Sequence, residues 1–209
     1  GFKVGGMEVT SGNALNISQV GGFSVVTKGK LTYDDASKTL TLKDATITLP
    51  PESEEAGLEF LGNQAYTIKL EGNNKILTTR GWAIRGQKGT LNIKGPGKLI
   101  VIMSDSLKGI MTQGDLYFSD KSKVIGAMPI LTEQGGKIYV DDAYIHAKNQ
   151  DSGLAIASEL NGGGNITLRN VKAYYQGKEA QIGICDGKKG GTTAQYRTFL
   201  YNNKPCNEI

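Results

Sequence analysis

The chain has 209 residues with a formal net charge of +4, and 29 of them are glycine, roughly twice the usual share. This length suits one domain, and a mild charge with four arginines argues against a nucleic-acid-binding protein. No apolar run approaches the roughly 18 residues that a transmembrane helix needs, and two cysteines are too few for a disulfide-dense scaffold.

Residues 1–36 alternate apolar and polar positions without sharing the pattern that follows them. Phe2–Val4 and Met7–Val9 are typical of short strands. The end of a stacked sheet leaves a strand edge unpaired, and such edges invite association. We therefore expect residues 1–36 to form an N-terminal β cap.

Six later segments share an apolar–polar–apolar opening, and their starts are 22 to 28 residues apart. They are Leu40–Leu42, Ile68–Leu70, Leu91–Ile93, Leu116–Phe118, Ile138–Val140 and Ile166–Leu168. A unit this short cannot bury its own apolar face, so the units must stack into a solenoid. Because parallel connections are right-handed, we predict an all-β, right-handed parallel β-helix of about six coils over residues 37–191. Residues 192–209 then form a C-terminal capping segment.

Residues 33–47 read Y-D-D-A-S-K-T-L-T-L-K-D-A-T-I. This string resembles a motif of secreted and lipid-anchored proteins of Bacteroides-type bacteria, which are pectate-lyase-like β-helices of the carbohydrate-binding-domain type. Residues 67–76, 89–93 and 109–110 resemble later coils of those proteins, and the similarity covers roughly residues 30–185. The resemblance implies an extracellular or outer-surface location, with any lipid anchor in a removed N-terminal segment. It supplies no catalytic residues.

Stacked coils would align outward-facing residues into columns with a spacing of about 4.8 Å. One predicted column holds Thr46, Lys75, Lys98, Lys123, Tyr144 and Lys172. Because adjacent like charges destabilise a sheet, this column favours a ligand with acidic groups, such as an acidic polysaccharide. Solvent-facing lysines whose stems cover apolar surface would give the same pattern.

A second predicted column holds Thr41, Lys69, Asn92, Tyr117, Tyr139 and Thr167. Tyr117 and Tyr139 are neighbours in it, so their rings are expected to stack as an outward platform on which a sugar ring can lie. Cross-strand aromatic pairing that only stabilises the sheet is the alternative interpretation.

Carboxylate doublets occur at Asp34-Asp35 and Asp141-Asp142, and glycosidases need two carboxyl groups about 5–9.5 Å apart. The hydrolases of the fold that the chain resembles carry Gly-His-Gly and Arg-x-Lys signatures, which this chain lacks. Its single histidine, His146, lies between Ile145 and Ala147 and therefore does not belong to a Gly-His-Gly signature. Asp141, Asp142 and Lys172 could serve a calcium-dependent lyase. We expect no enzyme, metal or cofactor, with a lyase or hydrolase as the alternative.

The two cysteines, Cys185 and Cys206, lie near the predicted end of the helix. They either form a disulfide that pins the C-terminal segment, as suits an exported chain, or remain two buried thiols. Two cysteines alone do not make a zinc site.

These patterns together predict a non-catalytic, secreted or cell-surface protein whose partner is a polysaccharide or surface glycan. The alternative is an adhesin or assembly component that binds another surface protein. The chain has glycine-rich turns without a following helix, so no phosphate-binding loop is predicted.

Overall fold

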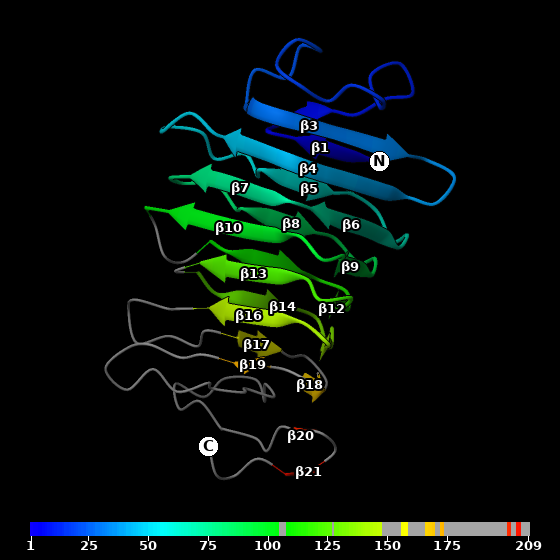
Figure 1. The fold of residues 1–209 in the computed structure, drawn as a ribbon, viewed down its shortest axis with the longest axis vertical. Helices are drawn as coiled ribbons and strands as arrows, with labels where there is room; N and C mark the ends of the chain where they lie inside the picture. The colour runs from blue at the N-terminus through cyan, green and yellow to red at the C-terminus, as the bar shows by residue number, and fades with distance from the viewer. Residues whose placement is uncertain are drawn as a thin grey trace.

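The structure is a computed structural model of the chain. It describes residues 1–104, 108–126 and 128–147, and the strand segments 156–158, 166–169, 172–173, 200–201 and 204–205. The described residues form strands and turns without any helix. Parallel strands stack in successive coils and form a β-solenoid of about four turns (Figure 1). Among these residues there is no helix with the length and apolar character to cross a membrane.

Two sheets run the length of the described solenoid. The first contains, in spatial order, β2 (Met7–Glu8), β1 (Phe2–Val4), β5 (Leu58–Phe60), β8 (Ile84–Gly86), β11 (Ile110–Thr112), β14 (Ile130–Thr132) and β17 (Ile156–Ser158). The second contains β21 (Lys204–Pro205), β20 (Leu200–Tyr201), β18 (Ile166–Arg169), β15 (Ile138–Asp141), β12 (Leu116–Phe118), β9 (Leu91–Lys94), β6 (Tyr66–Glu71), β4 (Thr39–Thr48), β7 (Asn73–Thr78), β10 (Lys98–Met103), β13 (Lys123–Gly126), β16 (Tyr144–Ala147) and β19 (Lys172–Ala173). Strand β3 (Val26–Asp34) pairs with β4 off this path.

The four coils from β6 to β17 contribute three strands each, and these pair in parallel with their equivalents in the neighbouring coils. The first coil has only β4 and β5, because β4 is continuous and pairs with both β6 and β7. Strands β6, β7 and β8 of one coil pair with β9, β10 and β11 of the following coil. Figure 1 shows β7, β10, β13 and β16 stacked one above another. The prediction that residues some two dozen apart become lateral neighbours is confirmed, because Leu116 pairs with both Leu91 and Ile138.

The predicted register between the second and third openings is wrong by two residues. Tyr66, and not Ile68, lies beside Leu91, while Ile68 lies beside Ile93. Strand β6 alternates over six residues and buries Tyr66, Ile68 and Leu70 alike. Because strand side chains alternate with a period of two, a shift by two residues preserves the buried face. Periodicity therefore could not distinguish these two registers.

The core consists of apolar, mostly aliphatic side chains stacked from coil to coil between the two sheets. Ile68, Ile93, Phe118 and Val140 occupy successive places in one such stack, and each is at most 1% exposed. Their burial leaves the intervening residues of each strand facing outward. Any site on the sheets is thus carried by these outward columns.

A sharp corner separates the two halves of the second sheet in each coil. The backbone there adopts positive φ at Asp44, Gly72, Gly95, Asp120 and Asp142. This left-handed conformation is the one that Gly, Asp and Asn tolerate best. The recurrent aspartates of the turns are therefore explained by backbone geometry.

Asn74 secures one of these corners from inside the solenoid. Its side chain is fully buried, and its Oδ1 accepts a hydrogen bond from the Ala45 N–H at 2.9 Å. Its Nδ2 donates to the carbonyls of Glu71 and Lys98 at 3.1 and 3.3 Å. One amide thus links three successive coils, and all of its hydrogen-bonding groups are used.

The N-terminal segments pair antiparallel with the first coil. Strand β1 pairs with β5 in the first sheet, and β3 pairs with β4 in the second. Phe2 is buried against Phe60 and Tyr33, at ring-centroid distances of 5.5 and 4.7 Å. Aromatic packing therefore covers this end of the core (the blue strands in Figure 1).

Candidate functional site

Tyr117 and Tyr139 form a stacked pair on the outer surface of the solenoid. They lie side by side on β12 and β15, with ring centroids 4.5 Å apart and ring planes inclined by 9°. Tyr117 lies between the buried Leu116 and Phe118. Tyr139 likewise lies between the buried Ile138 and Val140, so both rings project outward and are partly exposed. The predicted stacking is confirmed. The separation is close to the strand spacing of a parallel sheet.

The phenol of Tyr117 remains neutral at physiological pH. Partial burial raises its pKa above the ordinary value, and the nearby Asp115 carboxylate adds to this shift. A neutral phenol keeps its O–H and can donate a hydrogen bond to a ligand hydroxyl. The two rings cover each other's inner faces, so the pair offers a ligand its ring edges, its two outer faces and its hydroxyl groups.

This column is confirmed from Asn92 through Tyr117 and Tyr139 to Thr167, but it differs from the prediction before Asn92. Thr67 and Asn92 precede Tyr117 in the register, and Lys69 pairs with Lys94 instead. Lys69 forms an ion pair with Glu71 on its own strand, with an N–O distance of 2.7 Å. The platform is therefore flanked within its column by uncharged polar side chains.

The predicted lysine column is only partly correct. Lys98 pairs with Lys123, Lys123 with Tyr144, and Tyr144 with Lys172. Lys75 lies beside Ile100, and Asn73 takes the place next to Lys98. Within the described residues, no ion pair engages Lys98 or Lys123. The side chain of Lys172 is outside the described part.

The doublet Asp34-Asp35 has a structural role in the turn between β3 and β4. Asp34 accepts hydrogen bonds from the Ser37 hydroxyl at 2.6 Å and the Ala36 N–H at 3.0 Å, and these lower its pKa. The Lys38 ammonium, 2.6 Å from Asp35, lowers the pKa of that carboxyl. Both carboxylates stay ionised and hold the turn, which leaves neither suited to act as a general acid.

The remaining acidic candidates lie at corners. Asp115 Oδ1 accepts a hydrogen bond from the Lys137 N–H at 2.9 Å, and Asp142 occupies a positive-φ position. Asp141 is exposed and lies beside Arg169 in the register. No cluster of three or more potential metal ligands exists among the described residues.

His146 lies on β16 next to Ile125, away from the tyrosine column. Cys185 and Cys206 both fall outside the described residues, so the structure does not bear on their pairing.

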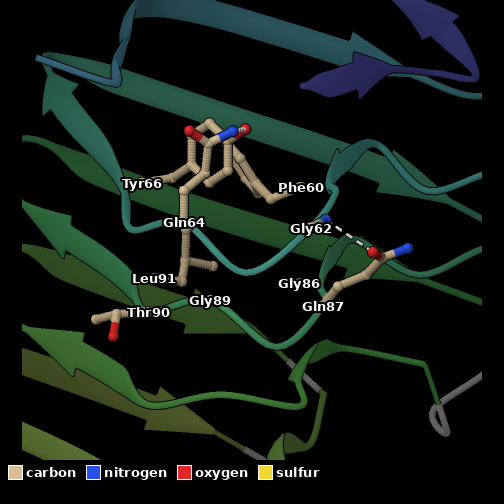
Figure 2. Close-up of a pocket in the computed structure, with 9 residues that line it drawn as sticks. All are labelled: Phe60, Gly62, Gln64, Tyr66, Gly86, Gln87, Gly89, Thr90 and Leu91. Atoms are coloured by element: carbon tan, nitrogen blue, oxygen red, sulfur yellow. Dashed lines mark hydrogen bonds between the residues drawn. The ribbon is translucent and has the colours of Figure 1, made fainter.

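A small cavity lies where the turns after β5 and β8 meet, and Figure 2 shows Phe60, Gln64 and Tyr66 gathered at its wall. Its volume of about 10 Å³ admits at most one water molecule. The Gln87 side-chain oxygen accepts a hydrogen bond from the Gly62 N–H at 2.7 Å and bridges the two turns. This cavity is too small for a ligand site.

The sequence analysis missed a cluster of outward-facing aliphatic residues on β7, β10 and β13. Leu77 pairs with Ile102, and Ile100 pairs with Ile125, in two adjacent columns. Ile102 is 49% exposed. The signal was available, since residues 99–103 read L-I-V-I-M and break the alternation that a half-buried strand shows.

Comparisons with protein-family models, with curated proteins and with solved structures found no match to this chain.

Proposed function

We propose that the protein binds a polysaccharide or surface glycan without cleaving it. The observation that carries this proposal is the outward-facing pair Tyr117 and Tyr139, stacked face to face at 4.5 Å with nearly parallel ring planes. Pyranose rings present C–H groups on one face, and these pack against aromatic faces while hydroxyls bond to polar neighbours. Asn92 and Thr67 supply such neighbours in the same column.

The lysines refine the ligand to an acidic polysaccharide. Lys98 and Lys123 are adjacent in the register, and no carboxylate within the described residues forms an ion pair with either. Strand β13 follows β12 along one coil, so Tyr117 and Lys123 both lie on the outer side of that coil. A chain with carboxylate or sulfate groups would relieve the repulsion between the two ammonium groups.

The proposal extends to the finer architecture and to the location. We propose a right-handed helix of about six coils over residues 37–191, closed by a β cap at 1–36 and a segment at 192–209. The protein is secreted or exposed on the outer cell surface, as are the Bacteroides-type proteins that it resembles. It is not an enzyme, and it uses no cofactor.

Binding to a panel of acidic and neutral polysaccharides, measured with soluble protein on an array and by calorimetry, tests this function. Tyr117→Ala and Tyr139→Ala are each expected to weaken binding at least tenfold, while Thr41→Ala, on another column, is the control. Lys98→Gln with Lys123→Gln is expected to weaken binding to acidic chains most. Lys75→Gln should have less effect, because Lys75 stands outside their column.

The absence of binding to any polysaccharide at millimolar concentration refutes the proposal. Circular dichroism verifies that each variant is folded. Release of reducing or unsaturated ends that disappears in Asp141→Asn would instead identify a hydrolase or lyase.

A second candidate function is binding to another surface protein. The exposed Ile102 and the partly buried, outward-facing Leu77, Ile100 and Ile125 favour it, together with the exposed Lys75 beside them. Apolar patches bordered by polar residues are typical of protein interfaces. Capture of an acidic surface protein, weakened by salt and by Ile102→Asp, would support this candidate.

A further inference from the structure

Strand β3 is paired with β4 along one edge and is covered only in part along its other edge. One edge pairs with β4 from Val26 to Asp34, with register shifts on both sides of Lys28. On the other edge, Leu31 exchanges two backbone hydrogen bonds of 3.1 Å with Ile17. The Tyr33 N–H donates to the Ala14 carbonyl at 2.7 Å. Residues 27–30 make no backbone hydrogen bond on that edge within the described part of the chain.

A recess lies along this uncovered stretch. Its volume is about 440 Å³, and it is a shallow depression that is mostly open to solvent. The lining residues are Asn16, Ser18, Gln19, Val20, Val26, Thr27, Lys28, Gly29 and Lys30. The recess therefore runs between the free strand edge and the loop that precedes it.

The chemistry of the recess suits an extended peptide. A strand edge presents unpaired N–H and C=O groups, to which a further strand adds by main-chain hydrogen bonds. Lys28 and Lys30 are exposed and form no ion pair within the described residues, so they favour carboxylate side chains on the added strand. Val20, which is 96% exposed at the wall, offers an apolar contact.

The same lysines disfavour a second copy of this chain as the occupant. Two such edges paired antiparallel would bring Lys28 and Lys30 of both copies together, and opposed like charges destabilise a strand pair. Lysines and bulges on edge strands keep identical chains apart, and β3 has an irregular register between Lys28 and Lys30 as well. Charge complementarity thus points to an acidic segment of a different protein.

We propose that the recess beside residues 27–30 binds an extended acidic peptide segment of another protein, which adds to the second sheet as a strand next to β3. About four residues of the partner are held, a span of about 13 Å at 3.3 Å per residue. Main-chain hydrogen bonds give this site its affinity, and the two lysines select acidic side chains. The site is independent of the tyrosine platform.

The probe is an acetylated and amidated decapeptide of alternating Glu and Val, added to the full chain. Fluorescence anisotropy gives its affinity, and ¹H–¹⁵N spectra locate its binding site. Two control peptides are alternating Lys and Val, and the Glu–Val peptide N-methylated at every second residue, which removes strand donors. The variant Lys28→Glu with Lys30→Glu is compared with Lys88→Glu with Lys137→Glu, which changes the net charge equally at other exposed positions.

We expect the Glu–Val peptide to bind and to shift the amide signals of residues 27–30, while both control peptides fail to do so. The Lys28→Glu and Lys30→Glu changes should weaken binding about tenfold, and the matched control should remain within about twofold. Absence of binding at 1 mM peptide overturns the proposal, as does binding that shifts signals elsewhere. Concentration-dependent self-association that shifts the same amides, seen by sedimentation, assigns the edge to a second copy and also overturns it.

Discussion

Replacing Asn74 with alanine tests whether one buried amide fixes the corner of the second sheet. The Asn74 side chain satisfies the Ala45 N–H and bonds to the carbonyls of Glu71 and Lys98. Alanine removes all three hydrogen bonds while it leaves the backbone conformation accessible. Ala45 is itself fully buried, so water cannot replace the lost acceptor without opening the coil.

The expected cost follows from the groups that lose their partners. A buried N–H without an acceptor costs about 1–3 kcal/mol, and each carbonyl loses a bond worth about 1 kcal/mol. The vacated volume adds a smaller penalty. Because the carbonyls can retain strand partners, we expect the free energy of unfolding to fall by about 3 kcal/mol.

Urea unfolding followed by circular dichroism measures this change, and Asn73→Ala is the control because Asn73 is exposed in the same turn. Repeat proteins can unfold in stages, so hydrogen exchange of the Ala45 amide supplies a local readout. The Ala45 amide should exchange faster in Asn74→Ala than in the wild type, but not in Asn73→Ala. Equal urea midpoints and equal Ala45 exchange in the two variants would refute the role assigned to Asn74.

Two further predictions concern backbone conformation and pH. Gly72→Ala should lower the free energy of unfolding by about 2 kcal/mol by urea titration, since φ is +66° and a Cβ would collide with the Asp44 carboxylate. Gly62→Ala, also at positive φ but with open space, should cost less, and equal losses would contradict this reasoning. Partial burial, with Asp35 nearby, raises the Tyr33 pKa above 10.0, so its contribution to stability is present below pH 10 and is lost as pH rises further. The melting temperature of Tyr33→Phe should therefore fall less between pH 9 and 11 than that of the wild type. An equal fall in melting temperature in both proteins would contradict this prediction.

The sequence predicted the solenoid and the tyrosine platform because both depend on strand alternation and repeat length. Tyr117 and Tyr139 each stand between two clearly apolar residues, 22 positions apart, and the register that this implies is the one observed. Because the inward positions of these strands are apolar, only one assignment of inward-facing and outward-facing residues was possible.

The lysine column could not be predicted in full because one inward position is polar. Asn74 occupies the place that Leu99 and Val124 occupy in the next coils, and it is buried through its hydrogen bonds. A pattern that assigns inward positions to apolar residues skips Asn74. It therefore aligns Lys75 with Lys98, although the true partner of Lys75 is Ile100, two residues further along the chain. Only the backbone groups around Asn74, which lie 24 to 29 residues away or in the adjacent turn, reveal why an amide belongs there.

Variation in coil length does not disturb the geometry of the outward columns. Paired residues are 29 positions apart between β4 and β7, 25 between β7 and β10, and 22 between β12 and β15. Loops and corners absorb these differences, while the strands hold a spacing fixed by main-chain hydrogen bonds. The two rings of the platform thus keep their parallel stacking because of strand register, and the loops beside them are free to differ in length. A ligand that lies along this column meets side chains at one constant interval, which suits a polymer with a regular repeat better than a compact small molecule.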